Sequence, residues 1–100
     1  MTTTPTTAAP TAEALGEAVG RIAGFAALSL HESFPHLDLD GLAEAFTRPS
    51  ALRMLSGRYL SGLDRGLPAG EAAAEAGTAL IHAWAEARLA ARAELDRQAR

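Results

Sequence analysis

The segment from His31 to Gly41 gathers the residue types that most often ligate metals or transfer protons. It holds two of the three histidines and three carboxylates within eleven residues. The order His31, Glu32, His36 approaches the zinc-protease motif, in which two residues separate the glutamate from the second histidine. Three residues separate them here, and Pro35 interrupts the helix that would place both imidazoles on one face. We therefore do not expect a zinc hydrolase.

The same segment can be aligned with a calcium-binding loop. With His36 at position 1, Asp38 and Asp40 fall at positions 3 and 5, and Gly41 falls at the sharp turn. Such a loop needs an aspartate at position 1 and a bidentate glutamate at position 12, where this chain has His36 and Thr47. We expect Asp38 or Asp40 to cap a helix instead of binding calcium.

Composition removes several other kinds of chemistry. The chain contains no cysteine, which excludes disulfides, thiolate zinc sites and cysteine nucleophiles and is typical of a reducing compartment. Twelve acidic residues against nine basic ones give a net charge of −3, so the electropositive surface that nucleic-acid binding requires is missing. We expect no signal peptide, because the first residues have neither a basic start nor an apolar core, and no apolar stretch approaches the ~20 residues of a membrane span. These features predict a cytoplasmic protein without membrane partners.

Two further residues in the C-terminal half could carry chemistry. His82 precedes Glu86 by one helical turn, which indicates a solvent-exposed pair. Trp84 lies within an apolar stripe and is expected to anchor the core. The serines lack a nucleophile-elbow context, and the glycines form no phosphate-binding motif. We therefore expect no enzyme, no cofactor and no bound metal.

The sequence predicts an all-α fold, a small four-helix domain with two long and two short helices behind a disordered N-terminal tail. Residues 1–11 are rich in threonine, proline and alanine and carry no charge, which is typical of disorder. Residues 12–100 are dominated by Ala, Leu, Glu and Arg, which favour helices, and are expected to form one domain. Capping residues and apolar spacing place the helices at 12–32, from Asp38 or Asp40 to about Arg48, at 49–64 and at 69–98. Gly66 is the expected C-cap of the third helix.

The expected core is thin. The hydrophobic share is 48%, but 24 of these residues are alanine, whose side chain buries little surface. The last helix would be about 45 Å long, more than the roughly 34 Å diameter of a compact domain of this size. We expect its last turns to project, bend or contact a partner.

Three glycines recur every fourth residue in the first predicted helix, and each costs a helix about 0.8–1 kcal/mol relative to alanine. One explanation is close packing against the small residues of the last helix, and a second is neutral drift in a chain rich in alanine and glycine. A third is a face for self-association or for a partner. If the third holds, Gly20→Leu leaves helix content intact and lowers the mass of the assembly. The predicted interaction surface consists of Gly16, Gly20, Gly24, Ala73, Gly77 and Trp84.

These patterns predict a non-enzymatic helical interaction or assembly module that self-associates or packs into a larger protein complex. The alternative is a small ligand-binding or regulatory bundle, with an apolar pocket between the side chains of Phe25, Phe46, Tyr59 and Trp84 and a polar contribution from a histidine. A weak DNA-binding regulator is a third alternative, although the arginines of residues 48–65 are spread around the helix.

Overall fold

The computed structural model describes residues 10–99 and contains four α-helices in this part of the chain. They are α1 (Ala12–Ser33), α2 (Leu39–Phe46), α3 (Pro49–Asp64) and α4 (Ala69–Gln98). The expected all-α class is confirmed, as is the division into two long and two short helices. The tail was expected to span residues 1–11. Residues 1–9 lie outside the described residues, and Thr11 belongs to the start of α1 as its N-cap.

The ends of α1 and α2 follow from local hydrogen bonds. The Thr11 side chain accepts a bond from the Ala14 N–H at 3.1 Å and opens α1. Asp38 opens α2 in the same way, with its carboxylate 2.8 Å from the Gly41 nitrogen. The cap was expected at Asp38 or Asp40, and the structure assigns it to Asp38. Helix α2 ends two residues earlier than expected, at Phe46.

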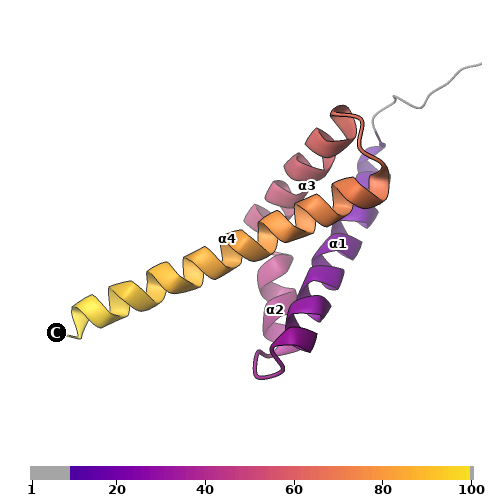
Figure 1. The fold of residues 1–100 in the computed structure, drawn as a ribbon. Coiled ribbons are helices and arrows are strands. Elements are labelled where there is room, and N and C mark those ends of the chain that lie inside the picture. Colours follow the sequence, from indigo (N-terminus) through magenta and orange to yellow (C-terminus); the bar gives the residue numbers. More distant parts are fainter. Residues whose placement is uncertain (1–9, 100) are drawn as a thin grey trace, which may run out of the picture.

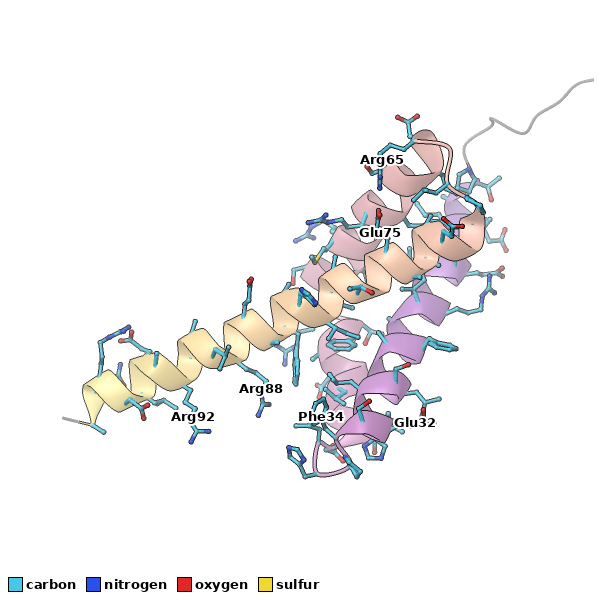
Figure 2. All side chains as sticks on the ribbon, viewed as in Figure 1. Glu32, Phe34, Arg65, Glu75, Arg88 and Arg92 are labelled. Atoms are coloured by element: carbon cyan, nitrogen blue, oxygen red, sulfur yellow. The ribbon has the colours of Figure 1, made fainter. Side chains whose placement is uncertain are left out.

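A glycine cap sets the turn between α3 and α4. Gly66 has a φ of +93°, a conformation that costs an L-side chain about 1–2 kcal/mol. The Leu67 N–H bonds to the Gly62 carbonyl and the Gly66 N–H to that of Leu63, both at 3.0 Å, which is the Schellman arrangement. Across this turn, Arg65, the C-cap residue after α3, forms an ion pair with Glu75 of α4 (Figure 2). The expected role of Gly66 is therefore confirmed.

The core lies where the four helices meet, and it is built from small side chains as expected. Five of its twelve buried apolar residues are alanine, and the largest fully buried side chains are Phe46 and Leu55. Trp84 is only partly buried and contacts the Phe46 ring edge-on, with 6.0 Å between ring centroids. This contact extends the core toward the middle of α4.

Helices α3 and α4 are in close contact at Gly62. A Cβ atom at Gly62 would lie 2.9 Å from the Cβ of Ala72 and 3.2 Å from its Cα. Gly62 and Ala72 are both buried. The atoms that the added Cβ would meet are the Cβ and the backbone Cα of Ala72, neither of which is the end of a flexible side chain that could move aside. The absence of a side chain at Gly62 is therefore required for this packing.

The C-terminal third of α4 leaves the bundle (Figure 1). Every residue from 86 to 99 is exposed, including Leu89 at 69% and Leu95 at 64%. The described residues consequently extend over 69 × 24 × 20 Å. Of the three outcomes expected for an overlong last helix, the structure shows projection. No helix among residues 10–99 is long and apolar enough to cross a membrane.

Gly62→Ala is expected to destabilise the fold by about 1–2 kcal/mol, because the added methyl must force α3 and α4 apart. Gly57→Ala is the matched control in the same helix, since a Cβ there meets nothing within 4 Å. That variant should be stabilised by about 0.5–1 kcal/mol through helix propensity alone. Urea denaturation followed by circular dichroism measures both, and equal stabilisation by the two variants would contradict the close approach.

Candidate functional site

A groove lies between α1 and α4, and we call it the α1–α4 groove. It encloses about 720 Å³ and is open to solvent along one side. One residue of α3, Tyr59, closes part of it. The lining is formed by Ala18, Arg21, Ile22, Phe25, Ala26, Ser29, Tyr59, Ala69, Gly70, Ala73, Ala74, Gly77, Thr78 and Ile81.

The groove exists because the residues on α4 that face it are small. Gly77 is buried against α1, and a Cβ built there would lie 3.5 Å from Cγ2 of Ile22. This contact brings the two helices together, but the alanines and glycines beside it are too small to fill the space between the outer edges of the helices. Phe25 stands at the edge of the groove with 73% of its surface exposed. The result is a concave apolar surface with an uncovered aromatic ring.

The polar groups of the groove can orient an occupant but have no acid–base pair. They are the hydroxyls of Ser29, Tyr59 and Thr78 and the guanidinium of Arg21, and no imidazole or carboxylate lines the groove. Among residues 10–99, no polar or charged side chain is buried. The groove is therefore suited to binding by apolar burial and shape, with Arg21 as its one charged lining residue.

A smaller cavity of about 230 Å³ lies where α4 leaves the bundle. Arg88 stacks over the Trp84 ring at 4.9 Å from its centroid, a cation–π contact. Asp38 and Gly41 of the α2 N-terminus line the opposite side. Figure 2 shows Arg88 and Arg92 extending from α4 on the side where Glu32 and Phe34 lie.

The structure divides the predicted interaction surface into three places. Ala73 and Gly77 line the α1–α4 groove, whereas Trp84 lines the smaller cavity and packs on Phe46. The three glycines of α1 lie outside both and are exposed: Gly16, Gly20 and Gly24. A Cβ at any of them would meet nothing within 4 Å, so the alternative in which they pack against α4 is wrong. Their role in association stays a prediction.

The expected pocket between four aromatic side chains does not form as one site. Phe25 and Tyr59 line the α1–α4 groove, while Phe46 is fully buried and Trp84 lies at the smaller cavity. Gly77 and Trp84 lie on nearly the same side of α4, but Trp84 is two turns farther along the helix, where it meets Phe46 of α2, whereas Gly77 meets Ile22 of α1.

Side chains in the segment from His31 to Asp40 form hydrogen bonds that stabilise a loop and a helix end. The His31 ring donates from Nδ1 to the Leu37 carbonyl at 2.7 Å, which fastens the loop between α1 and α2. Asp38 caps α2, and Thr47 donates its hydroxyl to the Ala43 carbonyl at the other end of that helix. Among residues 10–99, no three His, Asp or Glu side chains are grouped so that they could hold a metal ion. His82 is exposed, as expected.

The groove was not predicted from the sequence, although the spacing of residues in α1 indicates it. Ala18, Ile22, Phe25 and Ser29 recur at steps of four, three and four residues and form a second face of α1 beside the core stripe. A phenylalanine on that face indicates an apolar surface outside the core. Which part of α4 lies opposite depends on the crossing of the helices, which local spacing does not determine.

No protein-family model matches the sequence, and no curated protein or solved structure is significantly similar to the chain. The function must therefore be argued from the surfaces described above.

Asp38→Ala is expected to destabilise the fold by about 1 kcal/mol, because the Gly41 N–H loses its side-chain acceptor. Asp38→Asn is the matched control, since asparagine caps helices as well as aspartate does. Thermal denaturation of both variants checks the capping role. A loss of equal size in the asparagine variant would show that the negative charge matters instead of the cap.

Proposed function

We propose that the chain is a non-enzymatic helical interaction or assembly module, which self-associates or packs into a larger protein complex. The α1–α4 groove carries this proposal. A contiguous concave apolar surface with an aromatic ring at its edge is typical of a surface that a partner covers. The cysteine-free composition supports a cytoplasmic setting for this role.

The shape of the groove favours a helix as the occupant. Its two long walls are helices, and its α4 side is formed largely by alanine and glycine, which allow another backbone to approach closely. Proteins bind amphipathic helices in grooves of this construction through a few apolar anchors. Ala73 and Gly77 of the predicted interaction surface belong to this groove, and Gly16, Gly20 and Gly24 would supply a separate contact face.

The first experiment is the solution mass by light scattering across a hundredfold range of concentration, with helix content followed in parallel. Wild type is expected to associate, and Phe25→Gln to weaken association about tenfold or more, because a buried Phe contributes about 1.5–3 kcal/mol. Leu28→Gln is the matched control: Leu28 is another exposed apolar residue of α1, 45% exposed, and does not line the groove.

Gly20→Leu, included in the same series, tests the contribution of the glycine face. An equal effect of Phe25→Gln and Leu28→Gln would contradict a specific role for the groove. A folded monomer at every concentration would rule out self-association and leave a different protein as the partner.

The volume of the groove supports a second candidate, an apolar small-molecule ligand. Ligand pockets commonly have volumes of about 300–1,000 Å³, and the groove lies in that range. Anilinonaphthalene sulfonate is a suitable probe, because its rings match the apolar lining and its sulfonate can pair with Arg21. The ligand hypothesis expects saturable binding of one probe per chain that is lost in Phe25→Gln and kept in Leu28→Gln. Weak, unsaturable fluorescence in all three proteins would contradict it.

A further inference from the structure

The outer face of α1 carries two large apolar side chains that remain exposed in the described chain. Phe25 is 73% exposed and Leu28 is 45% exposed, and they lie one helical turn apart. A charged residue precedes them by four positions and another follows by four, so that one line of side chains runs along the helix. We call this line the α1 seam, and all of its members are exposed: Arg21, Phe25, Leu28 and Glu32. Alternating steps of four and three residues keep such a seam facing a partner helix.

The two ends of the α1 seam carry charges of opposite sign. Arg21 lies one turn before Phe25, and Glu32 lies one turn after Leu28. Within residues 10–99, neither Arg21 nor Glu32 forms an ion pair. Figure 2 shows Glu32 extending from the end of α1 away from the other helices. The seam therefore has a positive end, an apolar middle and a negative end, and it is complementary to itself when it is reversed.

We propose that the α1 seam pairs with the α1 seam of a second copy of this chain, with the two helices antiparallel. In this register Phe25 meets the partner's Leu28, and Arg21 meets the partner's Glu32. Two-fold symmetry repeats both contacts, so two apolar layers lie in the middle and one ion pair lies at each end. Parallel pairing would instead bring together the two copies of Arg21 and the two copies of Glu32, where like charges repel.

This contact includes the outer wall of the α1–α4 groove, because Arg21 and Phe25 also line that groove. The inference therefore rests on the proposed function: it names a second copy as the partner and α1 as the helix that this copy contributes. Gly24 lies beside Phe25 at the edge of the seam, and a Cβ there would meet nothing within 4 Å. The backbone at Gly24 is thus open to a partner helix.

The dimer is expected to be weak. The antiparallel register overlaps residues 20–33 of the two helices, which is about 21 Å of each. A contact of this length is smaller than the roughly 1,000 Å² at which specific interfaces begin, so we expect a dissociation constant on the order of 100 µM. Phe25→Gln should weaken this dimer more than Leu28→Gln, because Phe25 has the larger exposed surface to bury.

Charge reversal tests the pairing of the two ends. Arg21→Glu makes both ends of the seam negative, and Glu32→Arg makes both ends positive. Each variant alone should therefore dimerise about tenfold more weakly than wild type. An equal mixture of the two variants restores both ion pairs in a heterodimer, whose dissociation constant should lie within about threefold of the wild-type value. Sedimentation equilibrium measures these constants, and circular dichroism confirms that each variant is folded.

Arg53→Glu and Glu86→Arg are the matched control variants. Both positions are exposed and lie outside α1, and the two substitutions change the net charge by the same amounts as the two seam variants. A gain on mixing that came only from the difference in net charge would appear in the control mixture as well. We expect both control variants, alone or mixed, to dimerise within about twofold of wild type.

Distances between spin labels test the direction of pairing. The chain has no cysteine, so a label on Glu13→Cys, an exposed position in the first turn of α1, is unique. The two labels should lie about 40 Å apart in the antiparallel dimer, because each is about 20 Å from the centre of the pairing. Parallel pairing would bring the labels within about 20 Å of each other.

The outcomes separate this inference from the proposed function. A mixture of the seam variants that dimerises no more tightly than either variant alone, or labels within about 20 Å, would overturn the antiparallel dimer. Association through the groove still stands if wild type associates and Phe25→Gln weakens it. A chain that stays monomeric at every concentration would overturn both the dimer and self-association as the function. A gain on mixing that is confined to the seam variants, together with the long label distance, would support the inference.

Discussion

The structure depends on how closely α4 packs against its neighbours through small side chains. Gly62 of α3 meets Ala72 where an added Cβ would be only 2.9 Å from the alanine methyl, and Gly77 of α4 meets Ile22 of α1. These contacts fix only the first half of α4. The direction of the second half follows from them, since a helix continues straight unless proline, a bulge or an inserted group bends it.

The small size of the side chains at the helix contacts explains both the core and the groove. Alanine and glycine allow helices to approach closely, so a chain with few large apolar residues can still form a bundle in which Phe46 and Leu55 are fully buried. Such residues cannot also cover the outer edge of the contact between α1 and α4. The groove beside Gly77 is therefore a direct consequence of packing by small residues, and Phe25 is left without an intramolecular neighbour large enough to bury it.

Local signals in the sequence were sufficient for the helices and insufficient for the surfaces between them. Asp38 and Gly66 act through backbone groups a few residues away, so their capping roles could be predicted from the chain alone and are seen in the structure. Tertiary packing decides which small residues meet. The glycines of α1 were candidates for close approach to α4, but Gly62 of α3 has that role, and nothing in its local sequence distinguishes it from Gly57.

The thin core and the exposed C-terminal part of α4 both indicate that a partner would stabilise the folded chain. A small domain typically has a net stability of only about 5–15 kcal/mol, and here five of the twelve buried apolar residues are alanine, which buries little surface. Any partner that binds the folded chain and not the unfolded chain adds stability in proportion to the logarithm of its concentration. If the chain self-associates through the groove, as proposed, it is its own partner. Folding and association are then linked, because the groove that the partner covers exists only in the folded chain.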